Sequence, residues 1–336
     1  MTRILLTGAS GTVGQEVLKQ LTELTEPVEV TVFDINCRRS VTFYNRFNSK
    51  IKLVYGDLSD KKSVYRVCED KDVVIHLAAI IPPLADKDPS LAESVNIVGT
   101  QNLVECLEEL SPGVFFLYSS SISVYGDRNN NYMIRASDPL KPSDRDEYAR
   151  TKIAAEKIIT GSKLSWSIFR LTAIMGINNH KASALMFHMP LDSHLEIATP
   201  RDTGRAFVKA LKHPDELNKK IFNLSGGELC RIIYSDFISR SFEIFGLGNP
   251  DFKENSFAGK NFHCGYYEDC DTLNDILDFR RDSIEDYFRM VQDSIHPLRK
   301  LLASAFRKVI KSRLQKQSEP LRAVRTGNRK DIEHFF

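Results

Sequence analysis

The feature that most constrains the fold is a glycine-rich segment between two elements of opposite type, near the start of the chain. Residues 7–14 read TGASGTVG. They follow the apolar run Ile4–Leu6, which predicts a strand, and precede a helical pattern over residues 13–24. A strand that turns sharply into a helix brings free backbone N–H groups and the positive end of the helix dipole to one point. The segment therefore predicts a pyrophosphate site. Gly8 is expected to permit a tight turn, and Gly11 to leave room for the ligand to approach the backbone. Gly14 is expected to let the helix pack closely on the strand.

Short β-branched runs alternate with helical patterns through the first half of the chain. The strands predicted after the first one cover residues 29–33, 51–55, 73–77, 114–118 and 165–171. The helices predicted between them cover residues 60–69, 92–109 and 144–160. This alternation predicts an α/β fold, a Rossmann-type doubly wound parallel sheet with a smaller C-terminal substrate-binding region.

The pattern loosens beyond Leu171 and suggests how the chain is divided. We expect residues 1–171 to form a dinucleotide-binding domain and residues 172–295 to form the substrate-binding region, with 172–200 as a substrate loop or lid. Residues 201–227 are expected to return to the first domain. Residues 296–336 are predicted to form a basic amphipathic helix followed by a disordered polar tail.

Composition restricts the class of protein rather than its chemistry. Hydrophobic residues make up 42% and charged residues 27% of the 336 residues, as in ordinary soluble globular proteins. The six cysteines include no CxxC pair, which favours a reducing compartment. An apolar segment that starts at Ile4 leaves no room for a secretory leader. The sequence thus predicts a cytoplasmic protein.

An acidic residue at the end of the second predicted strand points to the kind of dinucleotide. Asp34 lies 20 residues after Gly14, where a carboxylate can bond the hydroxyls of an adenosine ribose. Because that carboxylate would repel a 2′-phosphate, Asp34 favours NAD over NADP as the cofactor. Arg38 and Arg39 follow closely and weaken this preference.

A tyrosine and a lysine on one predicted helix point to proton transfer. The sequence YARTK starts at Tyr148 and ends at Lys152, so the two side chains share a helix face. A phenol has a pKa near 10, and a fixed ammonium nearby lowers it by favouring the phenolate. The strand before this helix runs into YSSSISVYG, residues 118–126, whose hydroxyls can hold a substrate oxygen. Tyr125 is a rival phenol, but position 129 is Asn, so Tyr148 is the better candidate.

Together these pieces resemble an extended short-chain dehydrogenase/reductase, of the NAD-dependent epimerase/dehydratase family. The similarity covers residues 1 to about 176, in the family's order and at its spacings. The matching segments are TGASGTVG (7–14), Asp34, GDL (56–58), HLAA (76–79), VNIVGT (95–100), YSSSISVYG (118–126), YARTK (148–152) and FRLTAIMG (169–176). Weaker matches are RDTGRAF (201–207) and FNLSGG (222–227).

The resemblance implies the site residues and an assembly. The implied catalytic triad is Ser121, Tyr148 and Lys152, with Ser121 preferred to Ser119 and Ser120 because it lies four residues before Tyr125. It also places Asp57 and Leu58 near the adenine, Ala78 and Ala79 along the cofactor, and Asn96 near the nicotinamide half. The full implied cofactor set is Gly8, Ser10, Gly11, Thr12, Val13, Gly14, Asp34, Asp57, Leu58, Ala78, Ala79, Asn96, Tyr148 and Lys152. A homodimer through the helix of Tyr148 is a further implication.

Departures from the family's pattern narrow the expected reaction. Its 4,6-dehydratases carry Thr-Asp-Glu where this chain has Ser121, Ile122 and Ser123, so the acid–base pair for water elimination is missing. Its epimerases often have an Asn where this chain has Ala173. We therefore expect hydride transfer between the nicotinamide and a secondary alcohol or ketone of a sugar-like or polyol substrate. The alternatives are a nucleotide-sugar epimerase with the same triad and a non-catalytic protein that senses NAD(P).

Candidate substrate and metal ligands are weaker. Asn178, His180, Arg201 and Asp202 could touch substrate, although an ordinary loop role is favoured for each. His263, Cys264, Glu268, Asp269 and Cys270 match no zinc spacing, so no metal is expected.

The last 41 residues carry eleven Lys and Arg against three Asp and Glu, a balance of +8 in a chain of net charge +2. Apolar residues from Leu298 to Leu314 recur at helical spacing among these charges. Two interpretations stay open: the stripe packs on the protein's own body, or residues 297–316 dock on a membrane or a partner protein. Nucleic acid is not expected as a partner, because aromatic residues are not interleaved with the charges.

Overall fold

The computed structural model describes residues 1–47, 50–177 and 182–336. Its main sheet has seven strands in the order β10-β7-β5-β4-β1-β2-β3, and every neighbouring pair is parallel. The strands are β1 (Thr2–Thr7), β2 (Val28–Asp34), β3 (Lys52–Tyr55), β4 (Val73–His76), β5 (Phe115–Ser121), β7 (Ser165–Leu171) and β10 (Lys220–Leu224). This order confirms the predicted doubly wound parallel sheet.

The order of the strands reverses at β1. Strand β1 pairs with β2 on one side and with β4 on the other, so Thr7 has Phe33 and His76 as neighbours. In sheets of this kind, ligands bind beyond the carboxyl ends of the strands at the point of reversal. The glycine-rich segment starts at that point.

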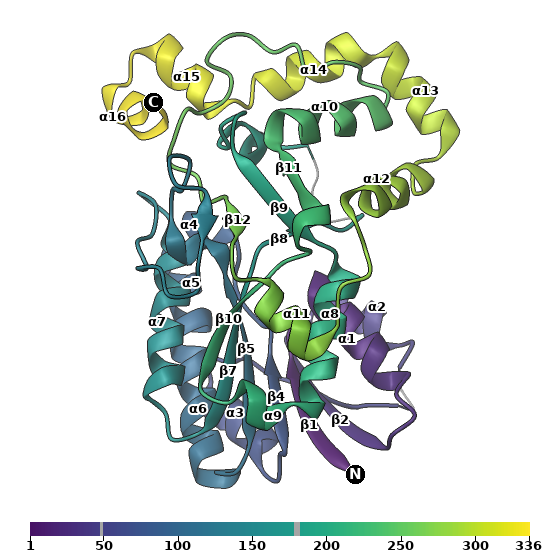
Figure 1. Cartoon of the computed structure of the whole chain (residues 1–336), viewed down its shortest axis with the longest axis vertical. Helices are drawn as coiled ribbons and strands as arrows, with labels where there is room; N and C mark the ends of the chain where they lie inside the picture. The colour runs from purple at the N-terminus through teal and green to yellow at the C-terminus, as the bar shows by residue number, and fades with distance from the viewer. Residues whose placement is uncertain (48–49, 178–181) are drawn as a thin grey trace.

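Helices cover both faces of the sheet (Figure 1). One face packs against α3 (Lys61–Cys68), α6 (Gly99–Leu110) and α7 (Glu147–Gly161). The other packs against α1 (Thr12–Thr22), α2 (Arg38–Tyr44), α8 (Pro200–Lys209) and α11 (Asp271–Leu277). Residues 92–109, predicted as one helix, contain a π-helical stretch over Glu93–Val98 before α6 begins. Two buried cores, one on each face, thus hold the strands rigidly beneath the candidate site.

A smaller region lies beyond the carboxyl ends of the strands. It contains a three-stranded sheet of β8 (Ala173–Ile174), β9 (His194–Ala198) and β11 (Arg231–Ile233), and a two-stranded sheet of β6 (Met133–Ile134) and β12 (Tyr266–Tyr267). Its helices are α10 (Tyr234–Ile244) and α12 (Ile284–Asp293), and the short helices α4 (Leu84–Lys87), α5 (Pro89–Ala92) and α9 (Pro214–Leu217) lie in connecting loops. Residues 172–200, predicted as a loop, therefore contain strands. The core of this region includes Phe187, Phe237, Phe242 and Phe288.

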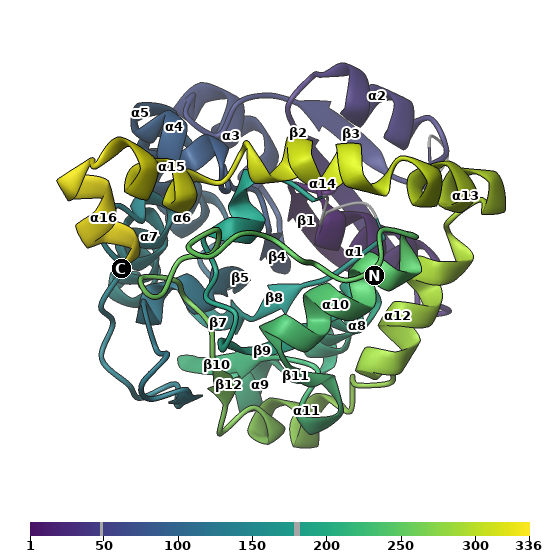
Figure 2. The ribbon, with the colours of Figure 1, turned by 90° about the horizontal axis from the view of Figure 1, so that it is seen from above.

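Four helices form the C-terminal segment: α13 (Pro297–Ala305), α14 (Arg307–Gln315), α15 (Glu319–Thr326) and α16 (Arg329–Phe335). They run across the side opposite the amino ends of the main strands (Figures 1 and 2). The predicted disorder of residues 317–336 is therefore wrong. Ser318 and Asn328 cap the last two helices, and a few apolar side chains bury there, namely Leu321, Ala323 and Phe335. These anchors are too widely spaced to stand out in a polar sequence.

Helix α16 holds the loop that leads into α7. Arg145 pairs with Asp331 at 3.0 Å, and Asp144 lies 3.1 Å from the ring of His334. Asn261 bridges the same parts, since its amide contacts His334 and its side-chain oxygen accepts from the backbone of Asp144. None of the described helices is long and apolar enough to cross a bilayer.

Candidate active site

The glycine turn has the close contacts that the sequence predicts. Gly8 has a φ of +70°, and a Cβ there would lie 2.6 Å from the backbone of Ala78. A Cβ on Gly14 would collide with the carbonyl oxygen of Gly8 and lie 2.6 Å from the Cα of Ala9. Gly14 thus lets helix α1 pack on the turn itself. A side chain at either position would force the loop apart.

The N-terminus of α1 presents its backbone to this turn. Gly11 is the N-cap residue, and in the described structure no side chain caps the helix. The N–H groups of the first helical turn, at Thr12 and Val13, therefore keep no side-chain acceptor and are suited to an anion. Ser10 has a different role, because its N–H donates to the Asp34 carboxylate at 3.0 Å.

Asp34 ends β2 and is held by three donors. Besides Ser10, the backbone N–H of Ile35 donates at 2.8 Å and the phenol of Tyr44 at 2.5 Å. Burial and the neighbouring carboxylate raise the pKa of Tyr44, which keeps this phenol protonated as a donor. The carboxylate therefore has a fixed position at the edge of the turn. The sequence offers no signal for Tyr44, which lies ten residues along the chain in a helix that we did not predict.

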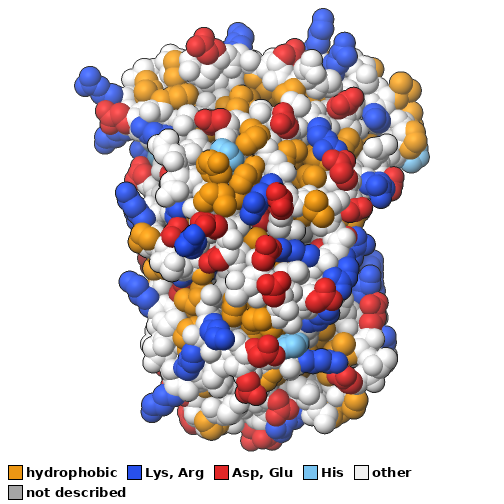
Figure 3. All heavy atoms as spheres, viewed as in Figure 1, with side chains coloured by type: hydrophobic (Ala, Val, Ile, Leu, Met, Phe, Trp, Pro, Cys, Tyr) orange, Lys and Arg blue, Asp and Glu red, His pale blue; other side chains and the backbone are white. Residues whose placement is uncertain are grey.

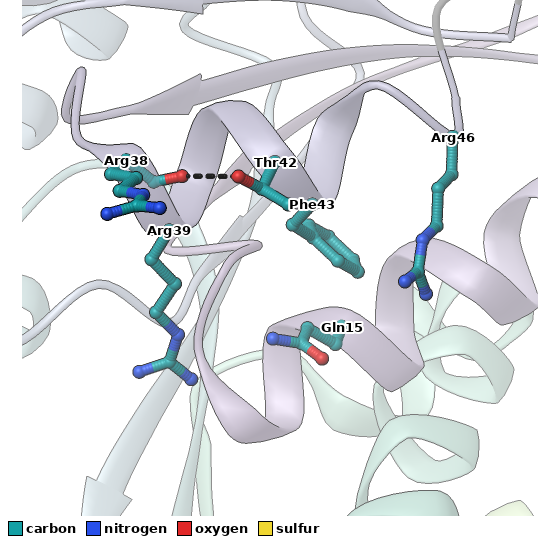
Figure 4. Close-up of a pocket in the computed structure, with 6 residues that line it drawn as sticks. All are labelled: Gln15, Arg38, Arg39, Thr42, Phe43 and Arg46. Atoms are coloured by element: carbon teal, nitrogen blue, oxygen red, sulfur yellow. Dashed lines mark hydrogen bonds between the residues drawn. The ribbon is translucent and has the colours of Figure 1, made fainter.

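Beside this edge lies an open, positively charged hollow of about 540 Å³ (Figure 4). It is lined by Gln15, Arg38, Arg39, Thr42, Phe43 and Arg46. Three guanidinium groups thus line the hollow, and two of them, on Arg38 and Arg39, follow Asp34 by only four and five residues and favour a phosphate there. As in the sequence, Asp34 favours NAD while the neighbouring arginines favour the 2′-phosphate of NADP.

The other residues of the predicted cofactor set follow neighbouring strands. Asp57 and Leu58 follow β3, which pairs with β2 so that Tyr55 lies opposite Asp34. Asp57 is exposed and accepts from Ser59, whereas Leu58 is buried. Ala78 and Ala79 follow β4, with the backbone of Ala78 against Gly8. Of these residues, Ala78 lies directly against the glycine turn.

Asn96 is buried and its amide is already used within the protein. It exchanges two hydrogen bonds with the backbone of Ile80, at 2.7 and 2.9 Å, and donates to Thr151 at 2.9 Å. It thereby ties the loop after β4 to helix α7. This geometry supports a bracing role rather than the direct cofactor contact that the resemblance implies.

The three consecutive serines at the end of β5 have different surroundings. Ser119 is buried and donates to the carbonyl of His76 at 3.3 Å, and Ser120 is buried and donates to Glu156 at 2.5 Å. Ser121 is half-buried at the strand end, where its hydroxyl accepts from the N–H of Ser123 and adjoins the phenol of Tyr148. Ser121 is therefore the serine best placed to meet a ligand.

Tyr148 and Lys152 lie one turn apart on α7. The Lys152 ammonium is buried, donates to the carbonyl of Ser119 at 2.7 Å, and lies 5.7 Å from the centre of the Tyr148 ring. Burial lowers the pKa of Lys152 to about 7, and Glu156 opposes this shift. Burial raises the pKa of Tyr148, while the hydrogen bond with Ser121 lowers it. The phenol therefore needs a charged neighbour to act as a base at neutral pH.

A buried ion pair ties helix α7 to strand β7. Glu156, one turn beyond Lys152, binds Arg170 of β7 through two hydrogen bonds of 2.7 and 3.0 Å. Arg170 donates to Tyr125, which donates to Asn223 at 2.7 Å. The Tyr125 phenol is thus bound into the interior, which supports the choice of Tyr148. Glu156 was not predicted from the sequence, although its spacing from Lys152 puts it on the same helix face.

The candidate substrate ligands either have structural roles or lie outside the described residues. Arg201 pairs with Asp282, and the buried carboxylate of Asp202 accepts from the N–H groups of Arg281 and Asp282. These contacts fix the segment before α12 to the N-terminus of α8. Asn178 and His180 lie outside the described residues.

The acidic and thiol groups near residue 268 are dispersed. His263 contacts Asp146, Glu268 pairs with Arg135, and Asp269 accepts from Ala136 and Asn223. Over the residues described, no three His, Cys, Asp or Glu side chains gather in a group that could hold a metal ion.

Comparisons with known proteins agree with this architecture. The sequence profile of the 3-beta hydroxysteroid dehydrogenase/isomerase family matches residues 5–166. Among curated proteins, an uncharacterized membrane protein of Methanocaldococcus jannaschii is 39% identical over 104 residues. That match covers 30% of this chain and 31% of the relative, so the chain spans about a third of the length of that protein.

Solved structures match over most of the chain. A short-chain dehydrogenase/reductase superfamily protein from Agrobacterium tumefaciens with bound NAD has a TM-score of 0.66 and 18% identity, covering 91% of this chain and 99% of that one. The UDP-glucuronic acid 4-epimerase of Bacillus cereus, solved with UDP-glucuronic acid and NAD, has a TM-score of 0.71 and 20% identity over 87% and 98%. A dTDP-glucose 4,6-dehydratase double mutant from Streptomyces venezuelae has a TM-score of 0.70 and 20% identity over 87% and 96%. Together with the order of the strands in the main sheet, these similarities show that the chain shares the fold of these short-chain dehydrogenase/reductase, epimerase and dehydratase structures.

Proposed function

We propose that the protein is an NAD-dependent oxidoreductase that acts on a secondary alcohol or ketone through Ser121, Tyr148 and Lys152. The observation that carries the proposal is the convergence of these three side chains. The hydroxyl of Ser121 adjoins the Tyr148 phenol, and the Lys152 ammonium is buried one helical turn away. The two neighbouring serines, by contrast, are bonded within the interior.

The residues of the turn fit a dinucleotide. A Cβ at Gly8 or Gly14 would fill the space where the loop closes, and α1 begins without a side-chain cap. Thr12 and Val13 would hold the pyrophosphate through their N–H groups, and Asp34 would hold the adenosine ribose. We favour NAD because Asp34 is fixed by three donors, while the nearby arginines leave NADP as the weaker alternative. When bound, the nicotinamide ring supplies the hydride acceptor or donor.

The protein's own groups would control the proton. Ser121 and Tyr148 would bond the oxygen of the substrate, whose charge changes during the reaction. Tyr148 would take the hydroxyl proton in oxidation and return it in reduction. Lys152, when protonated, favours the phenolate of Tyr148, and Glu156 favours the protonated form of Lys152. Lys152, kept protonated by Glu156, would thus lower the pKa of the Tyr148 phenol.

The substrate is expected to be sugar-like or a polyol. Similar structures were solved with UDP-glucuronic acid and UDP-glucose, which contain secondary alcohols in a ring. This kinship of fold favours a second candidate function, epimerisation of a nucleotide sugar with the same three residues. Retention of the tyrosine and lysine argues against a protein that only senses NAD(P).

A single substitution tests the assignment. Tyr148→Phe removes the proton carrier and leaves the ring in place, so turnover should fall at least about 100-fold while NAD still binds. Tyr65→Phe makes the same chemical change on an exposed residue and is the matched control. Turnover would be followed as NADH absorbance in a screen of secondary alcohols, and cofactor binding by calorimetry. Unchanged turnover in Tyr148→Phe would reject the triad.

The product separates the two candidate reactions. A dehydrogenase accumulates NADH with its substrate, whereas an epimerase interconverts two sugars without net NADH. The screen therefore includes UDP-sugars, with products resolved by NMR as well as by absorbance.

A further inference from the structure

Helices α13 and α14 carry a row of apolar side chains that the protein leaves uncovered. Leu298, Leu301, Leu302, Phe306 and Val309 are each between 51% and 67% exposed. Leu301 and Leu302 lie three and four residues after Leu298 in α13, and Val309 lies three residues after Phe306, so each set shares one side of its helix. We call these five residues the apolar ridge. Single exposed apolar residues are ordinary, but a continuous row marks an interaction surface.

The ridge faces outward because another side of the same helices is already occupied. Ala303, Ile310 and Leu314 pack on the core of the smaller region. Lys311 reaches back to the body, where it pairs with Asp251 and donates to the carbonyl of Asn249. The self-packing that the sequence analysis considered is therefore satisfied by these residues, and the ridge remains free.

The charge around the ridge has one sign. Residues 296–316 contain seven Lys and Arg and no Asp or Glu. Apart from Lys311, none of these cations has an ion pair with a described carboxylate; they are Arg299, Lys300, Arg307, Lys308, Arg313 and Lys316. Lys and Arg side chains project from the edge of the molecule that carries these helices (Figure 3). An anionic partner is the complement of this surface.

Apolar and basic groups also meet at the break between the two helices. An open hollow of about 490 Å³ lies there, lined by Leu301, Ser304, Ala305, Phe306, Arg307, Lys308 and Val309. A surface that presents apolar groups flanked by cations suits a partner whose anionic groups lie directly above an apolar layer. A phospholipid surface has that order, whereas a nucleic acid offers no apolar layer to the ridge.

We propose that α13 and α14 dock on an anionic phospholipid membrane, with the ridge in the acyl boundary and the flanking cations at the head groups. Each helix has nine residues, so both lie along the interface and neither spans it. The proposal does not depend on the reaction that the protein catalyses. It places the substrate-binding region next to the membrane surface.

Sedimentation of the full-length protein with vesicles tests the proposal. We expect binding to vesicles of phosphatidylcholine with about 30 mol% phosphatidylserine. The partition coefficient should fall at least about tenfold with phosphatidylcholine alone or in about 0.5 M NaCl.

Variants on the surface identify which residues bind. The double variant Leu301→Ser/Phe306→Ser should reduce binding to the anionic vesicles at least about tenfold, and Arg307→Gln/Lys308→Gln should reduce it several-fold. Leu229→Ser is the matched control, because Leu229 is 73% exposed outside these helices. Circular dichroism checks that each variant is folded. Absence of binding by the unmodified protein, or full binding by folded Leu301→Ser/Phe306→Ser, would overturn the proposal.

Discussion

The buried pair of Glu156 and Arg170 allows a quantitative test of what holds helix α7 in place. Both side chains are 4% exposed, and the carboxylate accepts from Arg170 twice and from Ser120 once. Glu156→Gln keeps the shape but leaves a buried guanidinium without a counter-charge. Removing one partner of such a pair costs about 3–5 kcal/mol in the free energy of unfolding.

A surface pair on the same helix provides the control. Glu147 pairs with Arg150 at 2.8 Å, but the two side chains are 28% and 56% exposed. Exposed pairs of this kind contribute about 0–1 kcal/mol, so Glu147→Gln should change stability little. Urea denaturation of the two variants and the unmodified protein, with m-values compared, measures both effects. Equal losses of less than about 1 kcal/mol would refute the reasoning from burial.

The same variant should also change the chemistry. Glu156 favours the protonated form of Lys152, so Glu156→Gln should lower the pKa of that ammonium. Less charge on Lys152 raises the pKa of the Tyr148 phenol, and the pH at which oxidation reaches half its maximum should move upward. A purely structural role for Glu156 would lower stability and leave the midpoint of the pH profile unchanged.

Three further outcomes are expected. Gly14→Ala should weaken NAD binding at least about tenfold by calorimetry, because its Cβ collides with the turn, whereas Gly113→Ala meets no atom within 4 Å and should bind normally. In the cofactor-free protein, the free energy of unfolding should rise by about 2 kcal/mol between pH 7 and pH 9, because the unfolded chain keeps the Lys152 proton up to about pH 10 while the folded chain loses it near pH 7. Urea denaturation should show no such rise in Lys152→Met. Asp34→Asn should reduce the ratio of the Kd for NADP to the Kd for NAD about tenfold, and the double variant Asp34→Asn/Arg39→Ala should restore that ratio. If neither variant changes the ratio, Asp34 does not contact the cofactor.

Local patterns were sufficient to predict the sheet and the turn. Gly8 and Gly14 stand between a strand and a helix, where the positive φ of Gly8 and the packing of Gly14 on the turn require glycine; only the contact of Gly8 with Ala78 involves a distant segment. Tyr148 and Lys152 are close because a helix repeats every 3.6 residues. Contacts between distant segments were not predictable in this way. Tyr44, for example, reaches Asp34 from the end of α2, and the sequence of α2 has no clear helical periodicity.

The C-terminal segment shows the same limit. Its first two helices were expected as one, but the chain breaks at Phe306, where ψ is 12°. Its last two helices were expected to be disordered, because Leu321 and Phe335 are few among polar residues. What orders them is their fit against the distant segments around Ser256 and Asn261. Such fit is a property of the assembled surface rather than of a local sequence pattern.

The contacts of α16 with the loop before α7 connect the C-terminal helices to the helix that carries Tyr148. Only three residues separate α14 from α15, and α16 holds Asp144 and Arg145, just before the helix that carries Tyr148. A displacement of α14 is therefore passed on through α15 and α16, and through the polar contacts of α16 with Asp144 and Arg145, to the first turn of α7.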